Sequence, residues 1–186
     1  MVNKYRNIKQ NLKSICLLVT LFSVSTLVSS ASLSSFKPSF SSIENTIVRK
    51  EVFFNYLLPV IYQKNAEIIA LRNSILNNEL SASELDKLAK KYRIEKLTSK
   101  EDLLLVIDIL PPSLVLAQAA NESNWGRSRF AEDFNNYFGI WCFKKGCGVV
   151  PNKRDDNASH EVASFKSLEE CIDYYVLNIN RSYAYE

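Results

Sequence analysis

The feature that most limits the possible folds is a long stretch, residues 46–78, in which apolar residues recur with helical spacing. Ser41 and Glu44 precede it with the spacing of a capping box, so we expect a helix to begin there and to break or kink at Pro59. The chain of 186 residues contains only four glycines. Few glycines and long periodic stretches favour helices over a sandwich or a barrel.

Three further helix starts are predicted where serine or threonine precedes glutamate by three residues, at Ser81, Thr98 and Ser167. Pro111 and Pro112 should end one helix and start the next. Between residues 138 and 165, the glycines and cysteines predict loops with a small hairpin. We therefore expect an α+β domain that is mostly helical with one irregular lobe.

The N-terminal segment has the layout of a secretory signal. Four basic residues and no acidic ones precede the apolar run Ile15–Val28, and small residues precede a plausible cut after Ala31. The run is shorter than the roughly 20 residues of a membrane-spanning helix. We predict export to the periplasm or cell envelope, with membrane attachment only through an uncleaved signal. Residues 32–44 would form a flexible linker, and residues 45–186 the domain.

The basic charge of the chain belongs largely to this signal. The whole chain has 23 Lys and Arg against 20 Asp and Glu, and four of the basic residues lie within residues 1–31. The exported part would therefore carry a net charge near −1, which gives no reason to expect a nucleic-acid partner.

Two cysteines lie close together in the predicted lobe. Cys142 and Cys147 should form a disulfide that closes a six-residue loop in an oxidising compartment. A metal site is the weaker alternative, because His160 is the only histidine and no CxxC pair is present. Cys171 is expected to be a buried thiol.

One carboxylate stands out in "AQAANESNWG", residues 117–126. On a helix, Val115, Ala119 and Glu122 share one face, with Gln118 one turn before the acid. Glu122 would thus emerge at the edge of an apolar stripe near the end of the helix, which suits a general acid. The alternative is a solvated surface charge.

Flat aromatic rings follow this acid in the sequence. Trp125, Tyr137, Phe138 and Trp141 could stack on sugar rings and bind substrate, or they could belong to the core. An acid beside such rings is the arrangement that glycoside cleavage needs.

The motifs "LPPSLVLAQAANESNWGRSRFA", "NNYFGIWCF", "GCGVVP", "HEVASF" and "SLEECIDYYVLNIN" together resemble the Bax-like branch of glycoside hydrolase family 73, over about residues 45–186. The resemblance implies a lysozyme-like α+β fold and hydrolysis of peptidoglycan glycan strands after N-acetylglucosamine, with no cofactor or metal. It implies that Glu122 is the catalytic acid. The residues that would line or shape the cleft are Gln118, Ser123, Trp125, Asn136, Phe138 and Gly139.

The second catalytic group is predicted on the variable lobe, with Glu161 as first choice and Asp155 and Asp156 as alternatives. It would act as a base or as a nucleophile. Substrate assistance by the N-acetyl group is a third route.

Domains of this family continue past the segment that ends at Glu186, into helices that carry an active-site tyrosine, so we expect the C-terminal part to be missing. Tyr174 and Tyr175 do not match that later position. This departure motivates two alternatives to an active hydrolase: a catalytically inactive glycan-binding remnant, and a secreted helical adaptor.

Overall fold

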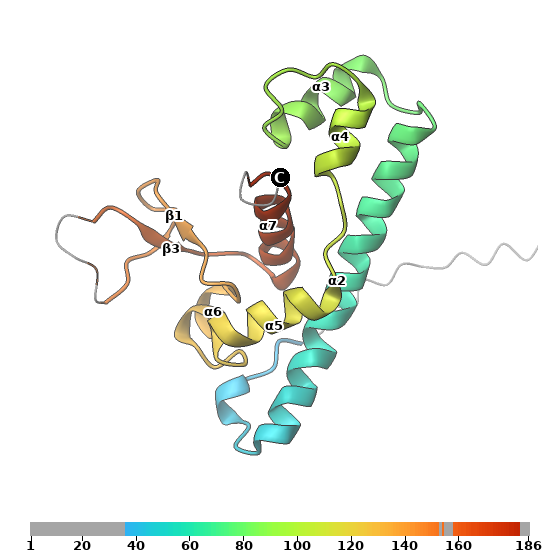
Figure 1. The fold of residues 1–186 in the computed structure, drawn as a ribbon. Coiled ribbons are helices and arrows are strands. Elements are labelled where there is room, and N and C mark those ends of the chain that lie inside the picture. Colours follow the sequence, from blue (N-terminus) through green and yellow to red (C-terminus); the bar gives the residue numbers. More distant parts are fainter. Residues whose placement is uncertain (1–35, 153, 155–157, 183–186) are drawn as a thin grey trace, which may run out of the picture. The chain divides into compact units, whose positions relative to one another are not determined.

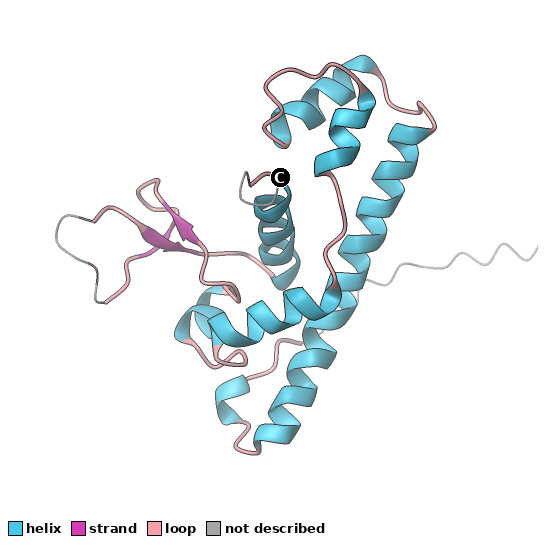
Figure 2. Ribbon diagram, in the orientation of Figure 1, coloured by secondary structure: helices cyan, strands magenta, loops and turns pink. Residues whose placement is uncertain are grey.

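The computed structural model describes residues 36–152, 154 and 158–182, which belong to one compact unit of the chain. Helices dominate it, and a small sheet lies beside them (Figures 1 and 2). The elements are the 3₁₀ helix η1 (Phe40–Ser42), α2 (Thr46–Leu76), α3 (Ala82–Lys91), α4 (Lys100–Val106), α5 (Pro112–Ser123), α6 (Arg129–Phe134), β1 (Trp141–Cys142), β2 (Gly148–Val149), β3 (Glu161–Ala163) and α7 (Leu168–Asn180). The prediction of a mostly helical α+β fold is confirmed.

The long helix α2 begins later than predicted and does not break. Its N-cap is Asn45, whose side chain accepts hydrogen bonds from the backbone N–H groups of Ile47 and Val48. The capping box predicted at Ser41 and Glu44 is therefore wrong. The predicted break at Pro59 is also wrong, because the helix continues through this residue. Pro59 is exposed, so water can reach the carbonyl group that loses its helical partner.

Residues 36–44 pack against the helices, which contradicts the part of the predicted flexible linker that the structure describes. The ring of Phe40 is fully buried and meets the rings of Phe53 and Tyr137 edge to face. The Lys37 ammonium donates hydrogen bonds to the Ala131 and Glu132 carbonyls at 2.7 and 2.5 Å. Apolar burial and this cap on the last turn of α6 hold the segment in place.

The remaining helix starts follow the predicted signals with one shift. Ser81 and Glu84 form the expected capping box of α3, and Ser167 caps α7 through the N–H of Glu170. In α4 the box consists of Ser99 and Asp102, one residue later than predicted.

Helices α5 and α7 both pack on α2 (Figure 1), and their apolar faces form the core. Polar side chains of α2 also hold the connection before α5. The Asn65 amide donates to the Leu110 carbonyl at 2.8 Å and accepts from the N–H of the same residue at 3.3 Å. Arg72 donates to the Leu104 carbonyl at 2.8 Å and to that of Ile107. These contacts fix where α5 begins, at Pro112 as predicted. The predicted end of the preceding helix at Pro111 is wrong, because α4 already ends at Val106.

The small sheet has the strand order β1-β3-β2 and is antiparallel throughout. Trp141 pairs with Val162 and Cys142 with Glu161, while Val149 also pairs with Val162. The predicted hairpin lobe is thus present as three short strands.

The predicted signal, residues 1–31, lies outside the described residues. Among residues 36–152, 154 and 158–182, no helix has both the length and the apolar character of a membrane-spanning helix.

Candidate active site

The helix α5 delivers Glu122 to the surface at its last turn. Val115 and Ala119 on the same side are fully buried, and Glu122 one turn further is exposed. The helix then ends abruptly, because Asn124, Trp125 and Gly126 all have positive φ angles, of 51°, 59° and 81°. The Glu122 carboxylate therefore lies at the C-terminal end of α5, just before the turn formed by residues 124–126.

Ser123 stabilises this helix end instead of lining a cleft. It is fully buried, its hydroxyl donates to the Ala119 carbonyl at 2.5 Å, and it accepts from the Gly126 N–H at 2.8 Å. A Cβ at Gly126 would lie 2.4 Å from the ring of Phe40, so this turn requires glycine for both space and backbone conformation.

The turn after α6 brings the backbone of Gly139 to Glu122. Asn136 is buried, and its amide donates to the Ile140 and Ala163 carbonyls, both at 2.9 Å. Its Oδ1 accepts from the N–H of Ile140 at 3.0 Å. Asn136 therefore shapes the turn and ties it to β3.

Gly139 lies beside the candidate acid. Its φ angle is +61°, and a Cβ added there would lie 3.2 Å from Oε2 of Glu122. The missing side chain lets the carboxylate approach the backbone of the turn, as the resemblance implied for a residue that shapes the cleft.

An aromatic stack joins this turn to α7. The ring of Phe138 stacks on that of Tyr175 with centroids 3.9 Å apart and planes 10° apart. The Tyr175 hydroxyl donates a hydrogen bond to Oε1 of Gln118. Gln118 and Tyr175 line a cavity of about 850 Å³, which Leu114 and Ile179 also line. Glu122 lies one helical turn beyond Gln118 and is not itself one of the residues that line this cavity.

Trp125 lies on the other side of α5. Its ring packs edge to face against Phe53 and Phe54 of α2, and the Lys50 ammonium lies 4.7 Å from its centroid. It borders a separate hollow of about 490 Å³ with Ala117 and other residues. The structure therefore does not bring Trp125 together with Gln118 in one cavity.

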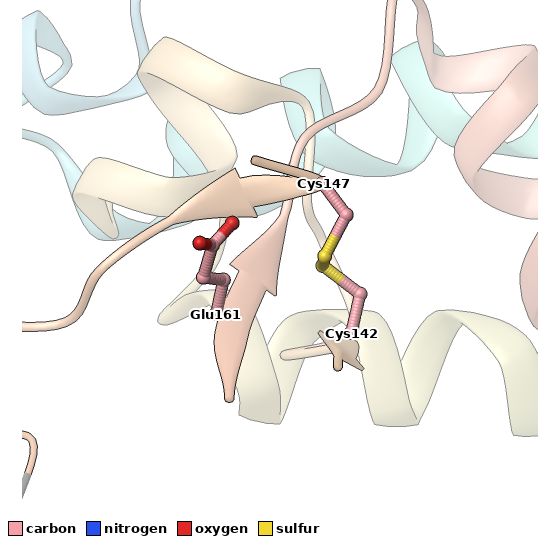
Figure 3. A group of neighbouring side chains, drawn as sticks. All are labelled: Cys142, Cys147 and Glu161. Carbon is pink, nitrogen blue, oxygen red and sulfur yellow. A yellow bond between two sulfur atoms is a disulfide. The ribbon is translucent and has the colours of Figure 1, made fainter. Parts of the chain in front are cut away.

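The predicted disulfide between Cys142 and Cys147 is present, with a Cα–Cα distance of 6.3 Å. Figure 3 shows it beside Glu161 of β3. Donor atoms of these three residues lie within 4.8 Å of one another. Because the disulfide uses both sulfur atoms, the group lacks the thiolates that a metal would need.

The carboxylate of Glu161 binds the backbone of the disulfide loop. Glu161 is buried, and its two oxygens accept hydrogen bonds from the N–H groups of Gly146 at 3.0 Å and Gly148 at 2.9 Å. These hydrogen bonds hold the pKa of Glu161 below its ordinary value. The alternatives Asp155 and Asp156 fall outside the described residues.

Two residues of this region escaped the sequence reasoning. Tyr175 was set aside because it does not match the tyrosine of the family, and its contact with Gln118 depends on how α5 and α7 pack. His160 was considered only as a metal ligand, yet its ring stacks on that of Trp141, with centroids 4.1 Å apart. Cys171, by contrast, is buried as predicted, and burial raises its pKa to about 12.

Two comparisons with known proteins bear on the family of this chain. Residues 102–186 match the family model of the glucosaminidases, described as mannosyl-glycoprotein endo-beta-N-acetylglucosaminidase. Over these residues the chain is therefore similar to the glucosaminidase-domain proteins.

One curated protein is similar to this chain over most of the length of this chain. The chain is similar to Protein bax of Escherichia coli (strain K12), with 32% identity over 149 residues, which cover 74% of this chain and 53% of that protein. The chain thus spans about half the length of the curated relative it matches. No solved structure matches it. The predicted resemblance to Bax-like glucosaminidase-domain proteins is confirmed.

Proposed function

We propose that this protein is an exported peptidoglycan hydrolase, an endo-β-N-acetylglucosaminidase with Glu122 as its general acid. The observation that carries the proposal is the exposed carboxylate at the end of α5, which lies close to the turn at Gly139 and one helical turn from Gln118, a residue of the cavity lining. The glucosaminidase family match supports a glycan substrate. Export rests on the signal predicted in residues 1–31.

In this mechanism Glu122 protonates the glycosidic oxygen as the bond from that oxygen to the anomeric carbon breaks. Water supplies the hydroxyl group of the new reducing end and returns a proton to the carboxylate. General acid catalysis of this kind contributes about 10² to 10⁴ in rate. Exposure of Glu122 allows a polymer to reach it without opening the core.

Glu161 as the second catalytic group stays a prediction, and its contacts support a different role. A base or nucleophile needs a carboxylate oxygen turned toward water or the anomeric carbon. Both oxygens of Glu161 instead accept backbone hydrogen bonds. We therefore assign Glu161 to positioning of the disulfide loop. Asp155, Asp156 and substrate assistance by the N-acetyl group then remain as the routes for the second step.

The test is release of reducing ends from purified peptidoglycan by the protein and by its Glu122→Gln variant, with the new ends identified by mass spectrometry. We expect N-acetylglucosamine at the new reducing end and a loss of about 100-fold or more in the variant. Glu51→Gln, at an exposed position of α2, is the matched control and should keep full activity. Undiminished release by Glu122→Gln would remove Glu122 from the mechanism.

The second candidate function is glycan binding without cleavage. The exposed ring of Trp141 supports it, because such a ring can bind a sugar whether or not Glu122 is catalytic. In that case the protein sediments with insoluble peptidoglycan but releases no reducing ends. An adaptor would show neither property and would instead retain a protein partner in a pull-down.

A further inference from the structure

The two faces of the small sheet carry different chemistry. Neighbouring residues of a strand point to opposite faces, so Cys142 and its partner Glu161 share one face, while Trp141 and His160 share the other. The stacking of the Trp141 and His160 rings, with planes 10° apart, agrees with this assignment. The disulfide and the Glu161 hydrogen bonds thus stabilise the sheet on the face opposite to Trp141.

Two aromatic side chains near Trp141's end of the sheet are exposed to solvent, although Val162, the pairing partner of Trp141, is buried. The side chain of Trp141 is 55% exposed although it lies in a strand, and Phe143, two residues later, is 73% exposed. His160 covers one face of the indole ring and fixes its plane, which leaves the opposite face available. The indole ring therefore presents a flat apolar surface that is about half exposed and is stacked on one neighbouring ring.

The strand that carries Trp141 begins close to the candidate active site. Trp141 follows Gly139 by two residues, a span of at most about 7 Å along the chain. Gly139 in turn lies against Glu122. A polymer whose scissile bond reaches Glu122 would therefore bring a neighbouring ring to Trp141.

We infer that Trp141 and His160 form a sugar-binding subsite, the aromatic platform, which holds the peptidoglycan glycan strand next to the bond that Glu122 cleaves. This inference rests on the proposed function. The flat apolar face of a sugar ring stacks on an indole ring, whereas a peptide or lipid would need a groove or a deeper apolar cavity. His160 is a positioning residue that sets the plane of the indole.

The test measures binding and cleavage separately. Sedimentation with insoluble peptidoglycan is measured in the Glu122→Gln background, and cleavage is measured with polymer and with a short soluble fragment. Trp141→Ala should weaken polymer binding and raise KM for polymer about tenfold, the equivalent of about 1.4 kcal/mol for one aromatic contact. The kcat values should not change. His160→Phe, which keeps a flat ring, should bind like the wild type, and His160→Ala should lose part of the affinity.

Tyr62→Ala is the matched control, because Tyr62 is 58% exposed on α2. Its polymer binding should equal that of the wild type.

Unchanged polymer binding in Trp141→Ala, or an equal loss in Tyr62→Ala, would overturn the platform. If the wild type binds through Trp141 but does not cleave, the platform stands and the proposed hydrolase fails. If Glu122→Gln loses cleavage but Trp141→Ala has the same KM for polymer as the wild type, the proposed hydrolase is supported and the platform is wrong. Trp141→Leu, which keeps an apolar side chain but no flat ring, replaces the alanine variant if the latter does not fold, with the same loss of polymer binding expected.

Discussion

The helical body and the sheet lobe are stabilised in different ways. In the body, formed by α2, α5 and α7, side chains such as Phe53, Leu57 and Ile172 are almost fully buried in one apolar core. In the lobe, formed by β1, β2 and β3, the strands have only two or three residues, and the main supports are a disulfide and a buried carboxylate.

Under the proposed function, the two regions carry different parts of the site. The proposed acid Glu122 stands on the body, where packing fixes the end of α5, and the aromatic platform stands on the lobe. Asn136 is the link, since its amide binds both the turn at Ile140 and the Ala163 carbonyl of β3. A lobe held by a few specific bonds can be weakened without unfolding the body, so each region can be tested alone.

The largest expected effect is on the body. Phe40→Ala removes a fully buried ring that meets Phe53 and Tyr137, and we expect a loss of about 3–5 kcal/mol in the free energy of unfolding. Urea denaturation measures it. Phe36→Ala is the control, because this ring is 93% exposed and its removal should change the free energy of unfolding by less than about 0.5 kcal/mol. Equal effects in the two variants would mean that residues 36–44 are a tether after all.

Loss of the disulfide should weaken the lobe alone. Replacing both Cys142 and Cys147 by serine frees a short loop, with an expected cost of about 2 kcal/mol. Hydrogen exchange should become faster at Gly148 and Ala163 while the amides of α2 keep their protection. A uniform acceleration across α2, α5 and α7 would show that lobe and body unfold as one unit.

The sequence predicted the body better than the lobe, for physical reasons. Helix starts depend on neighbouring residues, so Ser81 and Ser167 were identified, and Ser99 was missed by one position. Asn45 was overlooked because a more familiar serine–glutamate pair stood nearby. The fit of Phe40 over Gly126 depends on the folded chain, as does the binding of Glu161 to a loop fifteen residues earlier. Such long-range contacts leave no local pattern.

A smaller effect is expected where α5 meets α7. Tyr175→Phe keeps the stack on Phe138 but removes the hydrogen bond to Gln118, which should cost about 1 kcal/mol in the free energy of unfolding. Because Gln118 lines a cavity and lies one helical turn before Glu122, the proposed function predicts that KM for peptidoglycan should also rise. Tyr174→Phe, one residue away, is the control and should leave KM unchanged. Equal KM values for both variants would place Gln118 outside the substrate site.

The smallest effect concerns Glu161 and depends on pH. Its pKa is lowered by hydrogen bonds from Gly146 and Gly148, so the carboxylate stabilises the lobe above the ordinary glutamate pKa of about 4.3. That contribution is lost as the pH falls through the lowered pKa of the folded state. Hydrogen exchange at Gly146 and Gly148, corrected for its intrinsic pH dependence, should therefore accelerate below about pH 4 in the wild type.

In Glu161→Gln this pH dependence should disappear, because the amide does not titrate and keeps only one of the two acceptor oxygens. A positioning role predicts a higher KM for polymer and a kcat within a few-fold of the wild type, since the variant loosens the loop beside the aromatic platform. A catalytic role predicts instead that kcat falls by about 100-fold or more while hydrogen exchange at Gly146 and Gly148 stays as in the wild type. The second result would restore Glu161 as the partner of Glu122 and would make the lobe part of the catalytic machinery.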